Sequence, residues 1–72
     1  MITKYFKANV EDAVRIAVVE AEDADAMSDV PEAQNDREIK QSDLPEGFAD
    51  WKRYTAHAYR GASVHVMSRD GD

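Results

Sequence analysis

The first residues of the chain alternate between two kinds of side chain. In an extended chain Ile2, Lys4 and Phe6 fall on one side. The other side carries Thr3, Tyr5 and Lys7. The β-branched and aromatic residues among them favour extended backbone. The pattern therefore predicts a β-strand over residues 2–8.

From residue 10 onward the apolar positions follow a helical period. They recur at spacings of three and four: Val10, Ala13, Val14, Ala17, Val18, Ala21 and Ala24. Asn9 offers an N-cap, and Asp12 is placed to bond back in the manner of a capping box. The pattern predicts one main helix over about residues 10–26, with a small inner face of valine and alanine.

Residues 27–50 lack a sustained period. Turns are expected at residues 28–31 and 44–47, where proline and glycine occur. The part between the turns is compatible with a short helix over residues 31–41 or a short strand over residues 37–41. We therefore expect an acidic, loop-rich connector.

Residues 48–67 allow two interpretations. A helical period collects most of the aromatic residues on one stripe: Phe48, Trp51, Tyr54, Thr55, Ala58 and Tyr59. A period of two instead places Trp51, Thr55 and Tyr59 on one face of a strand, with a turn at residues 60–61 and a second strand at 64–67. The hairpin is favoured because a lone N-terminal strand needs neighbours.

These elements predict an α+β fold, with the helix of residues 10–26 packed on a small antiparallel sheet. Seventy-two residues suffice for one small domain, expected over residues 1–67 with a frayed tail at 68–72. A chain of this size hides only about 60% of the surface of its unfolded state, so the core is thin.

The charge is unevenly distributed. Nine Lys and Arg oppose fifteen Asp and Glu, for a net charge of −6. Residues 16–36 contain no basic residue and carry seven acids, so the rest of the chain is close to neutral: Glu20, Glu22, Asp23, Asp25, Asp29, Glu32 and Asp36. The best basic cluster, Lys52 and Arg53 with Arg60, is weak for nucleic-acid binding, which needs clustered cations. Direct contact with nucleic acid is therefore not expected.

Several of these acids fall at the end of the predicted helix. Acids at a helix C-terminus oppose its dipole and typically cost roughly 0.3–1 kcal/mol each, so stability alone does not favour them there. The functional interpretation is a surface for a basic protein partner, and the alternative is a solvated face that aids solubility. The candidate partner-binding residues are Glu20, Glu22, Asp23, Asp25, Asp29 and Glu32, with the aromatic anchors Trp51 and Tyr54.

Signals of catalysis and of metal binding are weak. The chain has no cysteine, and a two-residue turn at 60–61 would direct His57 and His65 to opposite faces. The acidic run fails the EF-hand pattern at Met27, Ser28 and Gln34. Glycines are too scattered for a phosphate loop, and Ser63 beside His65 is not a triad. We expect no enzyme activity, no metal and no cofactor.

Nothing in the sequence suggests a membrane segment. The longest apolar run covers four residues, 16–19, and residues 1–7 carry charges where a signal peptide is apolar. A cytoplasmic location, with no membrane partner, is therefore expected.

Residues 14–29, following the strand of residues 2–8, resemble segments of small acidic proteins of phages and mobile elements. Among these the chain is most similar, in size, charge and layout, to anti-CRISPR proteins that act on multi-subunit (type I) surveillance complexes. The resemblance implies a non-catalytic inhibitor that acts in the host cytoplasm. Its target would be a basic surface that normally holds guide RNA or target DNA, and some proteins of this kind mimic nucleic acid. It implies an inhibitory surface of Glu20, Glu22, Asp23, Asp25 and Asp29. The alternative is a small structural module, in which the aromatic face makes a homodimer and the acids only maintain solubility.

Overall fold

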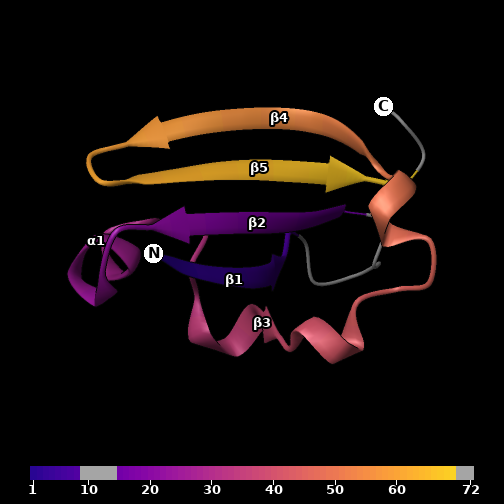
Figure 1. The fold of residues 1–72 in the computed structure, drawn as a ribbon, viewed down its shortest axis with the longest axis horizontal. Helices are drawn as coiled ribbons and strands as arrows, with labels where there is room; N and C mark the ends of the chain where they lie inside the picture. Colours follow the sequence, from indigo (N-terminus) through magenta and orange to yellow (C-terminus); the bar gives the residue numbers. More distant parts are fainter. Residues whose placement is uncertain (9–14, 70–72) are drawn as a thin grey trace.

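The structure, a computed structural model, describes residues 1–8 and 15–69. The described residues form one antiparallel sheet of five strands in the order β3-β1-β2-β5-β4 (Figure 1). The strands are β1 (Ile2–Lys7), β2 (Arg15–Ala21), β3 (Glu38–Ile39), β4 (Lys52–Tyr59) and β5 (Ala62–Ser68). The helix α1 (Ala24–Ser28) follows β2, and three 3₁₀ turns occupy Asn35–Arg37, Gln41–Asp43 and Phe48–Asp50.

The predicted main helix is wrong, and with it the predicted α+β class. Residues 15–21 form β2, the central strand of the sheet, and the only α-helix among the described residues has five residues. The helix prediction also covered residues 9–14, including the proposed cap at Asn9 and Asp12, which lie outside the described residues. The described part of the fold is a β-sheet with a short helix at one end, not a sheet carrying a main helix.

The physical reason for this error lies in the burial of β2. Ile16 and Ala17 are both buried although their side chains point to opposite faces. A strand covered on both faces presents a nearly continuous apolar run, and periodicity alone does not separate such a run from a buried helix. Ile16, Val18 and Val19 are β-branched, which favours the strand.

The first predicted strand is confirmed. β1 pairs with β2 along its whole length, with Phe6 opposite Ala17 and Ile2 opposite Ala21. β3 pairs with the other edge of β1 through two residues only, Glu38 and Ile39. This two-residue strand lies within the range expected from the sequence.

One face of the sheet, here called the core face, carries the main hydrophobic cluster. It is formed by Phe6, Ala17, Val19, Ala21, Val64 and Val66. Met27 of α1 and Val30 pack against them, so α1 and the residues after it cover this face. Val19 and Val64 are completely buried. Burial of apolar area on this face is the main stabilising contribution of the fold.

The opposite face has a smaller aromatic cluster beside the 3₁₀ turn Phe48–Asp50. The ring of Phe48 lies 6.2 Å from that of Tyr5 and 5.1 Å from that of Trp51, measured between centroids. Ile16 of β2 is 1% exposed and also faces this side. The two clusters hold the sheet from both sides.

The hairpin interpretation of residues 48–67 is confirmed over β4 and β5, which are joined by the two-residue loop 60–61. Gly61 adopts a φ of +76°, a conformation that glycine accepts without strain. His57 pairs with Val64 and His65 pairs with Ala56, so the two imidazoles point to opposite faces, as predicted.

A β-bulge corrects one detail of that hairpin. The register shifts between Arg53 and Thr55, so one extra residue is inserted and the alternation of side chains is offset there. Thr55 therefore shares the core face with Tyr59, whereas Trp51 packs on the opposite face, against Phe48. The prediction of one face for all three was wrong because a single sequence does not signal the bulge.

The connector expected over residues 27–50 is loop-rich, and it begins earlier, at residue 22, because β2 ends at Ala21. Apart from α1 and β3 it contains only the 3₁₀ turns and irregular backbone. The turn at residues 44–47 ends at Gly47, whose φ is +81°. At the other end of the chain β5 includes Ser68, which is 2% exposed and not part of a tail.

Candidate protein-binding surface

Acidic side chains gather at one end of the sheet, where β2 passes into α1. We call this surface the acidic end and define it by Glu20, Glu22, Asp23, Asp25 and Asp29. The end of β2 is held to the hairpin loop, because the Glu22 amide donates to the carbonyl oxygen of Gly61 at 2.9 Å. Glu20 and Glu22 line one shallow hollow of about 270 Å³, with Met1 and Ser63.

The local structure explains how α1 presents its acids. The Oδ1 atom of Asp23 accepts a hydrogen bond from the Ala26 amide at 2.9 Å and caps the helix. Asp25 is in the first turn, and Asp29 is the C-cap residue. Met27, between them, is buried in the core cluster. One turn of helix therefore holds its exposed carboxylates on a part of the chain anchored to the core.

This arrangement overturns the dipole argument made from the sequence. Asp23 and Asp25 lie at the N-terminus of α1, where a negative charge and a capping oxygen are favourable. The acids were predicted to be at the wrong end of a helix only because the helix was placed too early. The positions of Asp23 and Asp25 therefore do not oppose stability, so the case for function rests on exposure and clustering.

Cations of residues 1–8 and 15–68 do not neutralise the carboxylates of the acidic end. Glu22, Asp23, Asp25 and Asp29 are exposed, and none of them has a Lys or Arg of residues 1–8 or 15–68 within ion-pair distance. The negative potential of these carboxylates therefore extends into solvent.

Glu32, the sixth predicted acid, has a different role. Both of its carboxylate oxygens accept from the Tyr59 hydroxyl, at 3.0 and 3.3 Å. Desolvation raises the pKa of Tyr59, and the hydrogen bond to Glu32 and the negative charge of that carboxylate raise it further. Glu32 ties the connector to the end of β4.

The two predicted aromatic anchors lie away from the acidic end. Trp51 is only 8% exposed and belongs to the aromatic cluster. Tyr54 is 43% exposed, and its ring centroid lies 4.0 Å from the guanidinium carbon of Arg15. Both residues are at the start of β4, whereas the acidic end adjoins the opposite end of that strand (Figure 1). The structure does not bring the predicted acids and aromatics into one surface.

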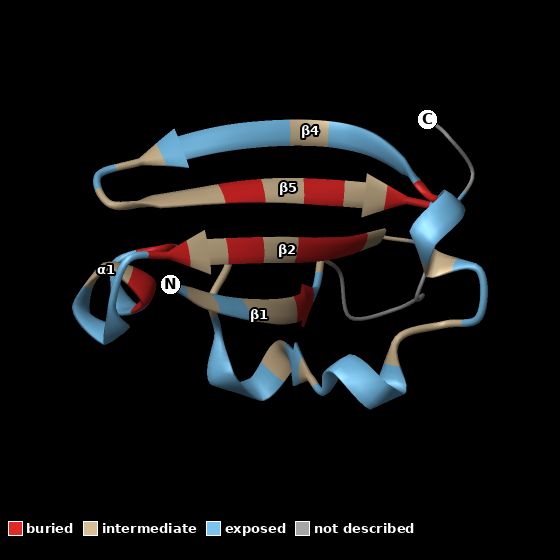
Figure 2. Ribbon diagram, viewed as in Figure 1, coloured by how far each residue is buried: buried red, intermediate tan, exposed pale blue. Residues whose placement is uncertain are grey.

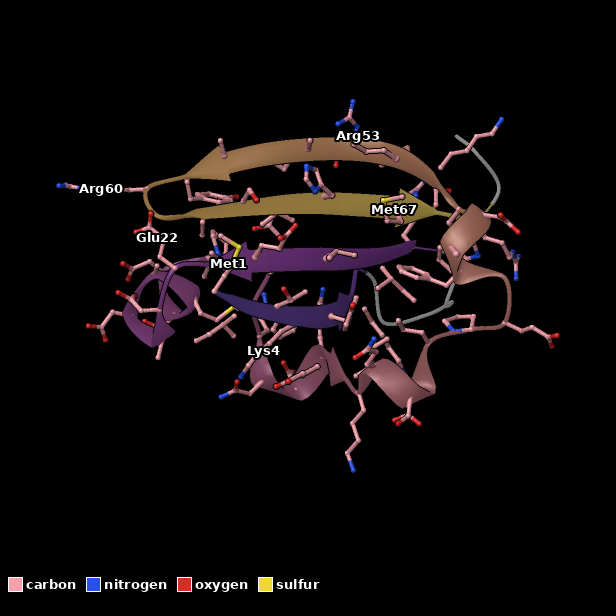
Figure 3. All side chains as sticks on the ribbon, in the orientation of Figure 1. Met1, Lys4, Glu22, Arg53, Arg60 and Met67 are labelled. Carbon is pink, nitrogen blue, oxygen red and sulfur yellow. The ribbon has the colours of Figure 1, made fainter. Side chains whose placement is uncertain are left out.

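A second charged region is more pronounced in the structure than the sequence pattern indicated. Residues 51–69, which include β4 and β5, contain Lys52, Arg53, Arg60 and Arg69 and no acid at all. Lys52, Arg53 and Arg60 are exposed, and none of these three forms an ion pair with a carboxylate of the described residues. Figure 3 shows Arg53 and Arg60 projecting away from the body of the protein along β4. The signal was available as the absence of Asp and Glu from nineteen consecutive residues.

An apolar groove lies beside the aromatic cluster on the opposite face. Its volume is about 520 Å³, and it is lined by Val18, Phe48, Ala49, Arg53, His65 and Met67. A second hollow of about 310 Å³ lies on the core face, between Phe6 and Met27, beside Lys4. Lys4 is engaged there in an ion pair with Glu38 at 3.8 Å.

The described residues do not assemble a recognisable chemical centre. No three His, Cys, Asp or Glu side chains of residues 1–8 and 15–69 converge as a metal site requires. His57 and His65 are on opposite faces of the sheet and do not act together. In the same part of the chain no helix has the length and apolar character needed to cross a bilayer.

The arrangement offers two binding surfaces. One is the acidic end, and the other is a basic hairpin, formed by β4 and β5 with the exposed Lys52, Arg53 and Arg60. Comparisons with protein-family models, with curated proteins and with solved structures found no match to this chain.

Proposed function

We propose that this chain is a non-enzymatic inhibitor whose acidic end occupies a basic, nucleic-acid-binding surface of a host defence complex. The observation that carries the proposal is the group of exposed carboxylates at the acidic end, with no cation of residues 1–8 or 15–68 paired to them. The resemblance to anti-CRISPR proteins selects a type I surveillance complex as the target. Glu32 is not part of the proposed contact, since it is engaged by Tyr59.

Electrostatics explains what the acidic end contributes. A surface of Lys and Arg that normally grips phosphates attracts carboxylates in the same way. Complementary potentials accelerate the encounter and fix its orientation more than they raise affinity. Such binding weakens as salt rises, because ions screen exposed charges over about 8–10 Å at physiological ionic strength.

Anchoring of α1 supports the proposal. Met27 and Val30 are buried, and Asp23 caps the helix, so the carboxylates on α1 are held before any partner arrives. Binding through a preformed surface loses less conformational entropy than binding through a loose segment.

Charge reversal tests the proposal. The triple variant Glu22→Lys, Asp25→Lys, Asp29→Lys leaves the cap at Asp23 intact. The matched control, Asp43→Lys, Glu46→Lys, Asp50→Lys, makes the same change in net charge at exposed positions outside the acidic end. Purified type I complexes loaded with guide RNA are assayed for binding of target DNA. We expect the wild type and the control to inhibit this binding and the acidic-end variant to lose inhibition.

Either of two results would count against the proposal. The first is equal inhibition by both triple variants, which would leave net charge or another surface responsible. The second is an absence of inhibition by the wild type across complexes of several type I subtypes. Circular dichroism and thermal unfolding of each variant establish that the folds are equivalent.

Dimerisation through an aromatic face, the alternative function, gains no specific support. Trp51 is packed inside, and Tyr54 is the only aromatic residue of the described chain among its exposed large hydrophobics. A second copy enters below as a competing occupant of a different surface, the edge of β4.

A further inference from the structure

We propose that the free edge of β4 binds an extended, acidic segment of a partner protein, which adds to the sheet as a sixth strand. The proposal concerns a surface of the opposite charge to the acidic end and is independent of the proposed function. It stands on the hydrogen-bonding direction of β4, on its exposure and on its charge.

Hydrogen bonds and pairings within the sheet determine which backbone groups face the free edge. The Glu22 amide donates to the Gly61 carbonyl, so Gly61 faces β2. In a strand, successive residues direct their N–H and C=O groups to alternate sides. Ala62 therefore faces β4, and its partner Tyr59 faces β5. By the same alternation Ala56 and Ala58 direct their N–H and C=O groups away from β5, to the free edge.

The second half of β4 is the open part of this edge. No residue of β4 is buried, whereas every residue of β2 and β5 is buried or half-buried (Figure 2). The bulge at Arg53 and Thr55 and the charged Lys52 protect the beginning of the strand, as such features commonly protect sheet edges. Beyond the bulge, Ala56 and Ala58 have small side chains that leave their backbone groups accessible.

Charge identifies the occupant. Arg53 and Arg60 flank the open part of the edge and are exposed, and residues 51–69 contain no acid, although Glu22 and Glu32 approach the Arg60 end from other elements. An added strand with acids near its two ends meets both arginines. Peptide recognition by strand addition works in this way, with affinity from main-chain hydrogen bonds and selectivity from side chains.

The same charges disfavour a second copy as the occupant. Antiparallel pairing of β4 with itself about Ala56 would place Lys52 of each copy opposite Arg60 of the other. Like charges directly opposed across a strand pair are destabilising.

The test uses two capped peptides with the full chain. The acidic probe is Glu-Val-Thr-Val-Thr-Val-Glu, and the matched control carries Lys at both ends. Calorimetry measures affinity, and amide hydrogen exchange followed by nuclear magnetic resonance locates the contact. We expect saturable binding of the acidic peptide with a Kd in the millimolar range or below. The amides of Ala56 and Ala58 should then exchange at least about tenfold more slowly, and the Lys peptide should not bind.

Two variants of the protein separate backbone from charge. Ala58→Pro removes one outward N–H without removing a bond to β5, and proline is tolerated at such edge positions. It should abolish binding, whereas Ala58→Val, which keeps the N–H, should retain it. If Ala58→Pro does not fold, the double variant Arg53→Glu, Arg60→Glu decides, because it leaves the backbone intact and should exchange preference from the acidic to the Lys peptide.

Several results would overturn the proposal. One is the absence of protection at Ala56 and Ala58 by the acidic peptide at millimolar concentration. Equal binding of both peptides, or an unchanged preference in the arginine double variant, would refute the charge argument. Protection of the same amides in the free protein, with a dimer in sedimentation, would assign the edge to a second copy. Binding of a single-stranded oligonucleotide in place of the peptide would assign the hairpin to nucleic acid.

Discussion

β2 and β4 are strands of similar length in one sheet, and they differ in almost every physical respect. β2 is paired on both edges and has four buried residues among its seven. β4 is paired on one edge and has none. The comparison shows that the centre of this small sheet supplies the stability, while the edge strand is free to carry a surface.

Charge follows the same division. β2 leads into the acidic end, whereas β4 begins with Lys52 and Arg53 and ends before Arg60. The net charge of −6 averages two regions of opposite sign. A partner at the Lys52 and Arg53 end of β4 meets cations, whereas a partner at the other end meets the carboxylates of the acidic end beside Arg60, and the net charge describes neither encounter.

Removing a large side chain from the centre should have the largest effect. Phe6, opposite Ala17 of β2, is 1% exposed. Phe6→Ala should lower the free energy of unfolding by about 3–5 kcal/mol, a large share of the 5–15 kcal/mol typical of domains. Tyr54→Ala at the exposed start of β4 should lower it by less than about 1 kcal/mol, mainly through the lost contact with Arg15. Urea unfolding measures both, and equal losses would break the comparison.

An exchange of similar volume sharpens the comparison, because it isolates polarity. Val19→Thr introduces a hydroxyl at a completely buried position of β2 and should cost about 1–3 kcal/mol if the hydroxyl finds no partner. Thr55→Val makes the reverse exchange on β4, at a half-buried position. It should change stability by less than about 0.5 kcal/mol. A comparable loss at both positions in urea unfolding would show that β4 is as well packed as β2.

These contrasts also explain how far the sequence determined the fold. The strand of residues 2–7 and the hairpin were predictable, because a period of two and a two-residue loop fix local geometry. The loop length alone placed His57 and His65 on opposite faces. β2 was not predictable, because burial on both faces removes the alternation that identifies a strand. The sequence contains no signal for the bulge in β4, and the bulge places Trp51 on the face opposite to that of Thr55 and Tyr59.

The candidate surface was predictable to a similar extent. Clustering of acids in the sequence identified the acidic end, although the stated reason, a conflict with a helix dipole, was wrong. Engagement of Glu32 by Tyr59 was not foreseen, because the two residues are far apart in sequence and are brought together only by the fold. The basic character of the β4–β5 hairpin was underestimated, because Lys52, Arg53 and Arg60 are dispersed along the chain and their shared exposure depends on β4 being an edge strand.

The cap of α1 tests whether the helix belongs to the stable centre or to the periphery. Asp23→Ala removes the acceptor for the Ala26 amide and should cost about 1 kcal/mol. Asp23→Asn keeps a capping oxygen and should cost only a few tenths of that amount, about 0.3 kcal/mol or less. Hydrogen exchange of Asp23→Ala shows whether α1 opens locally or together with the sheet. If the Ala26 amide exchanges faster while the amides of β2 are unaffected, α1 opens locally. A uniform acceleration would place α1 in the same cooperative unit as β2.

The smallest effect is expected where the connector meets β4. The hydroxyl of Tyr59 donates to Glu32, and desolvation, together with the hydrogen bond to this carboxylate and its charge, raises the pKa of Tyr59 above its ordinary value. The folded state therefore favours the protonated phenol. The resulting stability is complete below the unfolded pKa and is lost as pH rises through the folded pKa.

As the pH is raised from about 8 to about 11, the urea concentration at the midpoint of unfolding should fall more for the wild type than for Tyr59→Phe, which lacks the titrating group. Glu32→Gln keeps an acceptor but removes the charge, so its pH dependence should lie between the two. Identical slopes for the wild type and Tyr59→Phe would mean that this contact does not hold the end of β4. The edge strand would then depend on β5 alone, which is the sharpest form of its contrast with β2.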